Sequence, residues 1–134
     1  MKTWLNVSEP SPAATVAPFA ADEELLDSAV VLELCDTLTL EMRSSLMATF
    51  EATLPACLAD ISGAARRGDR LGLKRTAHML KGSAATLGAC RLACACQSIE
   101  QTGRDLDRTV GDAELEALRA TARTTCRALR KQLL

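Results

Sequence analysis

The chain has 134 residues and a net charge of −1, a size that suits one domain of ordinary length. Apolar residues make up 48% of it but aromatic residues only 2%, so the core must consist of aliphatic, Met and Cys side chains, which favour helices over strands. No apolar run approaches the ~18 residues that span a bilayer, and the first residues lack the apolar core of a signal peptide, so we expect a cytoplasmic protein without direct membrane contact.

Residues 1–21 are expected to form a flexible leader or linker. Three of the chain's four prolines lie here among Ser, Ala and Thr, a composition typical of linkers. In the alternative, the segment docks on the folded part through its apolar residues, which are Trp4, Leu5, Val7 and Phe19. Residues 22–134 are expected to form the folded domain.

A short first helix is expected over residues 22–36, because the acidic residues at its start suit a helix N-terminus. A long second helix is expected over residues 39–65, where apolar residues recur at three- and four-residue steps. Pro55 lies inside this helix and removes one backbone donor, so we expect a kink there. The stripe of the second helix contains Leu40, Met47, Phe50, Leu54, Cys57, Leu58 and Ile61.

The third helix, expected over residues 70–86, has an apolar face and a second face that carries His78, the only histidine of the chain. At ~100° per residue, His78 lies roughly 120–180° away from the apolar stripe. Gly88 is expected just beyond the end of this helix. The apolar stripe contains Leu73, Leu80, Ala84 and Leu87, and the histidine side contains Lys74, Arg75, Lys81, Gly82 and Ala85.

A fourth helix is expected over residues 89–102, ended by Gly103, and a polar loop over residues 104–111. The fifth helix is expected from Asp112, as its N-cap, to the C-terminus. Its stripe contains Leu115, Leu118, Ala122, Cys126, Leu129 and Leu133, and that of the fourth helix contains Leu92, Cys96 and Ile99. Four long amphipathic helices with short connections predict an all-α, antiparallel four-helix bundle, which the short first helix would cap at one end.

The surroundings of His78 suit a histidine that carries a phosphoryl group. Lys81 and Gly82 follow it by three and four residues, so the three residues share one helix face. Imidazole is nucleophilic near neutral pH because its unperturbed pKa is ~6.5. A glycine inside a helix costs about 0.8–1 kcal/mol relative to alanine, and the close approach of a partner would explain why Gly82 is there. The alternative is a core or surface histidine without a role.

Residues 77–88, AHMLKGSAATLG, resemble the histidine phosphotransfer (HPt) family, whose mark is a helical His-x-x-Lys-Gly followed by small residues and Leu-Gly. The similarity covers roughly residues 25–134 and extends weakly to Leu92, Cys96 and Ile99-Glu100. It implies an HPt-like four-helix bundle in a two-component phosphorelay. In that role His78 accepts a phosphoryl group from a receiver-domain aspartate and passes it to a second receiver domain.

The resemblance also assigns roles to the neighbours of His78. It implies that Lys81 stabilises the phosphoryl oxygens, and Arg75 would help through its charge. The receiver would dock over Lys74, Gly82, Ser83 and Ala85, whose small members keep the surface low. For Arg75 and Lys74 the alternative is a solvated surface residue, and Ser83 has the alternative of a hydrogen bond to its own helix backbone.

The uneven distribution of charge predicts an acidic partner. Residues 1–65 carry ten acidic and two basic side chains (2 − 10 = −8), whereas residues 66–91 carry seven basic and one acidic (7 − 1 = +6). The positive field is therefore centred on the histidine segment and would attract an acidic protein surface. Nucleic acid is the rival partner, but the segment has neither an aromatic stacking residue nor a nucleic-acid-binding motif, so we expect none.

We expect the isolated chain to hold no metal and no cofactor. Cys90, Cys94 and Cys96 suggest a zinc site near His78, but their spacing is not that of a zinc knuckle, and apolar core filling explains them better. The sequence has no Gly-rich nucleotide loop and no acidic cluster near His78 that would bind Mg²⁺. The chain is therefore predicted to be a phosphoryl carrier without its own ATP site, and the partner receiver domain would supply the Mg²⁺.

Two alternatives come from other functional classes. In one, the bundle only binds a partner protein and is never phosphorylated. In the other, it is the substrate domain of a larger histidine kinase, whose ATP-binding domain phosphorylates His78 directly. The Pro- and Ala-rich leader would suit a module at the C-terminal end of a hybrid sensor kinase, which would then be a partner in cis.

Overall fold

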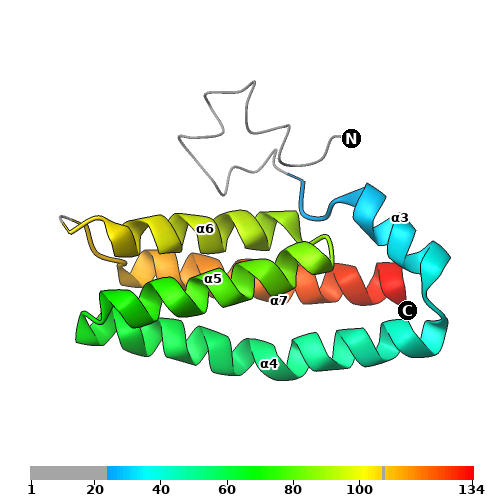
Figure 1. Ribbon diagram of the computed structural model, residues 1–134, viewed down its shortest axis with the longest axis horizontal. Coiled ribbons are helices and arrows are strands. Elements are labelled where there is room, and N and C mark those ends of the chain that lie inside the picture. Colours follow the sequence, from blue (N-terminus) through cyan, green and yellow to red (C-terminus); the bar gives the residue numbers. More distant parts are fainter. Residues whose placement is uncertain (1–23, 107) are drawn as a thin grey trace.

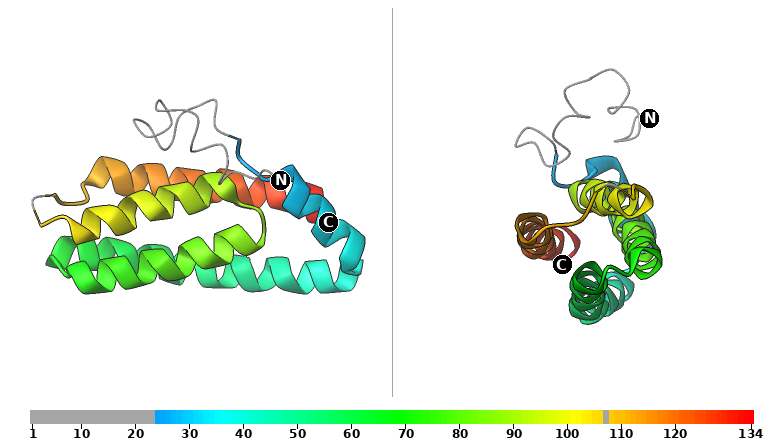
Figure 2. Two further views of the ribbon diagram at one scale, coloured as in Figure 1. Left: turned by 45° about the horizontal axis from the view of Figure 1, so that its top comes forward. Right: turned by 90° about the vertical axis from the view of Figure 1, so that its left-hand side faces the viewer.

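The computed structural model describes residues 24–106 and 108–134, and within these ranges it contains five helices and no strand. The helices are α3 (Ser28–Thr37), α4 (Leu40–Arg67), α5 (Arg70–Thr86), α6 (Cys90–Arg104) and α7 (Asp112–Leu133). Both α4 and α6 pack against α5 and against α7, so the four long helices surround one core (Figures 1 and 2). The all-α, antiparallel four-helix bundle is confirmed. Among the described residues, no helix is long and apolar enough to cross a membrane.

Side-chain and glycine caps fix the bounds of α4 and α5. The hydroxyl of Thr39 accepts a hydrogen bond from the backbone N–H of Met42 at 3.1 Å, which starts α4. Gly68 ends α4 with a φ of 70°, in the left-handed region that glycine tolerates. The Asp69 carboxylate then caps α5 by accepting from the backbone N–H of Gly72 at 2.9 Å. The helix α4 continues through Pro55, and the kink expected there stays a prediction.

The apolar stripes fill the core almost as expected. The four stripe residues of α5 are buried, and those of α6 and α7 are buried except for the half-buried Cys126. In α4, Leu58 is half-buried, and Leu40 remains 54% exposed because it is the first residue of the helix, at the end of the bundle. Burial on one side of α5 leaves its opposite side, with His78, toward solvent.

The first helix is shorter than the predicted 22–36, since α3 begins at Ser28 with Asp27 as its N-cap. Before it, the backbone is tied to the turn between α5 and α6, where the N–H of Asp27 donates to the carbonyl of Gly88 at 2.7 Å. Gly88 has a φ of 78°, and a Cβ there would lie 3.1 Å from the Cβ of Val30. These contacts hold α3 across one end of the bundle, as expected. The predicted leader, residues 1–21, lies outside the described residues.

The fourth helix is longer than expected, because α6 continues through Gly103 to Arg104. A Cβ on Gly103 would lie 3.4 Å from the carbonyl oxygen of Arg70, so the glycine permits close packing of α5 on α6 rather than ending the helix. The predicted N-cap of the last helix is also off by one residue. Gly111 is the N-cap, and its backbone N–H donates to the Glu114 carboxylate at 3.1 Å.

Candidate functional site

The candidate site is built around His78, near the middle of α5. Its neighbours Ala77 and Leu80 face the core and are 0% and 2% exposed, whereas the His78 side chain is 67% exposed. A helix that buries one stripe of residues exposes the residues of its opposite face to solvent. The apolar stripe of α5 therefore fixes the histidine ring on the surface of a rigid helix.

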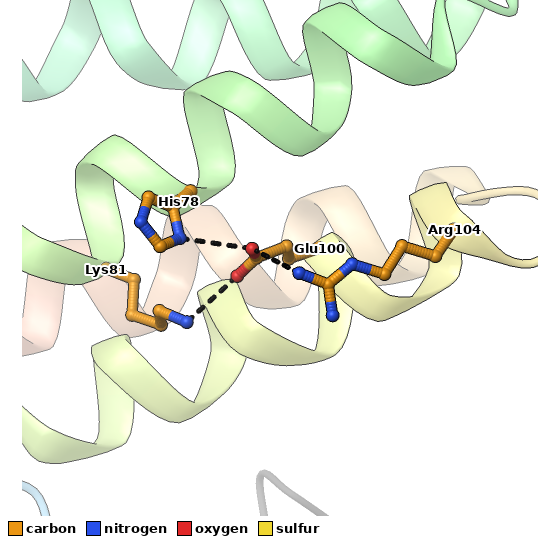
Figure 3. Close-up of polar contacts among 4 residues, drawn as sticks. All are labelled: His78, Lys81, Glu100 and Arg104. Carbon is orange, nitrogen blue, oxygen red and sulfur yellow. Dashed lines mark hydrogen bonds and ion pairs between the residues drawn. The ribbon is translucent and has the colours of Figure 1, made fainter.

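Glu100 of α6 holds the ring from one side. Its Oε2 lies 3.1 Å from Nδ1 of His78 (Figure 3), and its side chain is only 5% exposed. Figure 3 shows the second ring nitrogen, Nε2, on the side of the ring away from Glu100. One nitrogen of His78 is thus occupied, and the other is left for an incoming group.

Two permanent cations share the same carboxylate. The Lys81 ammonium donates to Oε1 of Glu100 at 2.9 Å, and Nη2 of Arg104 donates to Oε2 at 3.1 Å (Figure 3). The Lys81 side chain is 25% exposed and that of Arg104 is 60% exposed. A single buried negative charge therefore faces two positive charges and an imidazole, which leaves the cluster with an excess of positive charge.

The environment keeps Glu100 ionised. Burial alone would raise the pKa of the Glu100 carboxyl, but the hydrogen bonds and charges of Lys81 and then of His78 outweigh it, so the pKa lies below its ordinary value. An ionised carboxylate only accepts hydrogen bonds. The contact with Glu100 therefore assigns the ring proton of neutral His78 to Nδ1 and leaves the lone pair on Nε2.

Of the two residues predicted to stabilise a phosphoryl group, only Lys81 lies in the cluster. Arg75 is exposed and makes no hydrogen bond or ion pair with any described residue. Lys74 is half-buried, and its Cβ lies 3.6 Å from the position that a Cβ on Gly103 would take. Neither residue contacts Glu100 through a hydrogen bond or an ion pair.

The small residues after His78 form a low surface. Gly82 is exposed, and a Cβ there would have no heavy atom within 4 Å. Ser83 is exposed and lines a groove of about 180 Å³ between α4 and α5, whose walls include Leu46, Phe50 and Leu80. Ala85 is half-buried. The surface beside His78 therefore passes over a glycine into an apolar groove.

Of the three cysteines near His78 in the sequence, Cys90 and Cys96 are buried and Cys94 is half-buried. Cys90 is buried, and its Sγ donates to the carbonyl of Glu24 at 3.2 Å. Burial raises the pKa of the Cys96 thiol to about 12, so this thiol is protonated at neutral pH. Over residues 24–106 and 108–134, no group of three or more His, Cys, Asp or Glu side chains is arranged to hold a metal ion.

Sequence reasoning missed Glu100 and Arg104. Glu100 occupies an inward position on α6, four residues after the buried Cys96, and a charged residue in an apolar stripe is the signal that could have identified it. Arg104 was assigned to the polar loop, although it lies in the last turn of α6 and four residues after Glu100. Both residues come from a helix that is separated from His78 by a turn of the chain.

The comparisons with known proteins agree with this geometry. The model of the Hpt domain family matches residues 45–132. The crystal structure of histidine-containing phosphotransfer protein B from Pseudomonas aeruginosa PAO1 is similar with a TM-score of 0.73 and 24% sequence identity, over 85% of this chain and 96% of that one, a likeness in fold. Among curated proteins no sequence matches the chain. Because the family model covers more than half of its residues, this chain belongs to the Hpt domain family.

Proposed function

We propose that this protein carries a phosphoryl group on Nε2 of His78 and exchanges it with aspartates of receiver domains in a phosphorelay. The observation that carries the proposal is the orientation of one exposed imidazole by one buried carboxylate, with Glu100 on Nδ1 and Nε2 left open. Membership of the Hpt domain family supports phosphotransfer as the general role.

The transfer itself needs only a nucleophile and a leaving group. The lone pair of Nε2 attacks the phosphorus of an aspartyl phosphate, and the bond between phosphorus and the aspartate oxygen breaks as the P–N bond forms. The aspartate leaves as a carboxylate, and the ring, still protonated at Nδ1, takes up positive charge. Glu100 stabilises that charge at 3.1 Å. The reverse sequence passes the phosphoryl group to a second receiver.

Lys81 is the proposed partner of the phosphoryl oxygens. It lies three residues after His78 on the same helix face, and its ammonium needs only to move from Glu100, 2.9 Å away. Arg104 keeps the carboxylate paired when Lys81 moves, because it binds Oε2 independently. Arg75 contributes to the positive field of the exposed surface rather than to a direct contact.

The receiver is proposed to dock over Gly82, Ser83 and the α4–α5 groove, flanked by Lys74 and Ala85. The open space around Gly82 and the apolar walls beyond Ser83 provide room and contact area. The receiver is also proposed to supply the Mg²⁺ that phosphoryl transfer uses.

The test compares phosphoryl donors. A phosphorylated receiver domain with Mg²⁺ should label the chain with one phosphate that is labile in acid and stable in base, without added ATP. If only a histidine-kinase ATP-binding domain with ATP labelled the chain, the proposal would be wrong. The bundle would then be the substrate domain of a histidine kinase. No labelling by either donor, with receiver binding retained, would leave a bundle that only binds its partner.

A further inference from the structure

A second apolar groove is lined by residues of α3 and α7, and these two helices lie next to each other at one end of the bundle (Figures 1 and 2). It has a volume of about 450 Å³, within the ~300–1,000 Å³ typical of binding pockets. Leu26 and one face of α3 form most of its wall, with Val31, Leu32 and Cys35, and Gln132 of α7 closes one side. No residue of the His78 site contributes to it.

The helix that forms this groove is poorly covered. Of the ten residues of α3 only Val31 is buried, and Leu32 is 63% exposed. Leu40, Met42 and Leu134, near helix ends at the same end of the bundle, are 54%, 53% and 47% exposed. A contiguous apolar patch marks an interaction site, and the groove joins Leu26, Val31 and Leu32 in one such patch.

The chain leaves the described fold at the edge of this groove. The Glu24 carbonyl is held by Cys90 at 3.2 Å, and Leu26, two residues later, is part of the wall. Phe19 precedes Glu24 by five residues, which span up to about 17 Å when extended. A helix of ten residues is only ~15 Å long. The reach of Phe19 from Glu24 is therefore comparable to the length of α3.

The composition of the preceding segment suits burial. Residues 10–21 contain no charged side chain, and two of the three aromatic residues of the whole chain, Trp4 and Phe19, precede Glu24. Aromatic side chains bury the largest apolar areas. A tethered segment also has an effective concentration near the millimolar range, which favours it over a free partner.

We propose that residues 10–21 dock in the α3–α7 groove with Phe19 as the anchor, so that the leader covers the exposed face of α3. The occupant is thus the chain's own N-terminal segment rather than a second copy or another protein. The contact is apolar and remote from the His78 cluster, so it does not depend on phosphoryl transfer.

The chain offers a direct test because it contains one Trp and no Tyr. The double variant Trp4→Phe, Phe19→Trp places the only indole at the proposed anchor of the full chain. Its emission should be shifted to the blue and its quenching by acrylamide should be several-fold slower than in a peptide of residues 1–23 with the same changes. Adding Leu32→Asp should restore peptide-like values. The matched control Leu71→Asp, at a residue of α5 that is 59% exposed, should not.

Peptide-like emission and quenching in the double variant would overturn the proposal, and so would shielding that Leu32→Asp leaves unchanged. Shielding that rises with protein concentration together with a dimer in sedimentation would assign the groove to a second copy, which also contradicts it. Leu32→Asp should leave phosphorylation of His78 at its normal rate. Failure of the docking proposal is therefore distinguishable from failure of the proposed phosphotransfer function.

Discussion

Glu100 reaches across from α6 and holds Nδ1 of His78 at 3.1 Å, although 22 residues separate the two in the chain. The same carboxylate is bound by Lys81 at 2.9 Å and by Arg104 at 3.1 Å. One buried negative charge thereby orients the ring and keeps two cations beside it. This relationship leaves Nε2 as the ring nitrogen that we propose to carry the phosphoryl group.

We expect Glu100 to stabilise the fold in a pH-dependent way. Its pKa is lowered in the folded chain, so its contribution is fully present above the unfolded pKa of ~4.3 and is lost as the pH falls through the lower folded pKa. Glu100→Gln should reduce the free energy of unfolding by about 1–3 kcal/mol at pH 7. Urea unfolding of both chains should show this difference shrinking below about pH 4.

The matched control is Glu51→Gln, which removes the partner of Arg130 on the surface, where Arg130 is 56% exposed. That change should cost no more than about 1 kcal/mol. A difference between Glu100→Gln and wild type that is the same at pH 3 and pH 7 would contradict an ionised, stabilising Glu100.

Gly82 is expected to serve access rather than stability. No heavy atom lies within 4 Å of a Cβ placed there, so Gly82→Ala should stabilise the chain by up to about 1 kcal/mol. Gly82→Leu should keep a thermal midpoint close to wild type but slow transfer from a phosphorylated receiver, because the side chain would stand where we propose that the receiver docks. Wild-type transfer kinetics in Gly82→Leu would mean that the receiver does not approach over this residue.

Gly88 is expected to be structural. Its φ of 78° and the crowding against Val30 at 3.1 Å both oppose a side chain. Gly68 has a similar φ of 70° but no atom within 4 Å, which makes it the matched control. Each change to Ala should cost roughly 1–2 kcal/mol for the left-handed conformation, and Gly88→Ala should cost a further ~1–3 kcal/mol for crowding. If Gly88→Ala and Gly68→Ala lost the same free energy of unfolding in chemical denaturation, α3 would be shown to shift without cost and make room for the added methyl group.

The periodic segments were the part of the fold that the sequence predicted well. The bounds of α5, 70–86, are confirmed because a regular apolar stripe lies between a Gly-Asp turn and a Leu-Gly end. The start of α3 was missed because the backbone before it is tied to the distant Gly88 by a hydrogen bond from Asp27, which then caps the helix. The end of α6 was missed because packing against Arg70 makes Gly103 favourable inside a helix.

The site was predictable in part for a similar reason. His78, Lys81 and Gly82 share one helix, so their proximity follows from local spacing. Glu100 acts from another helix, and a pattern that assigns charged residues to the surface cannot place it in the core. Only its position in the apolar stripe of α6 indicated that it points inward.

Receiver binding is expected to weaken with salt but to persist. The basic segment around His78 should attract an acidic receiver, and ions screen such attraction beyond ~8 Å at physiological ionic strength. Lys74→Glu or Arg75→Glu should slow association in stopped-flow experiments more than they speed dissociation. Arg127→Glu, an exposed residue on α7 across the bundle, is the matched control and should have little effect. An association rate constant that changes neither with the charge reversals nor with salt would rule out electrostatic steering by this face.

The most direct test of the account is the transfer of labelled phosphate from a phosphorylated receiver to wild type and to His78→Gln. His78 is the only histidine and its side chain is 67% exposed, so the substitution should preserve the helical circular dichroism and the thermal midpoint. We expect stoichiometric, acid-labile labelling of wild type and none of His78→Gln. Acid-labile label that persists in the folded His78→Gln chain would contradict the assignment of His78 as the phosphoryl carrier.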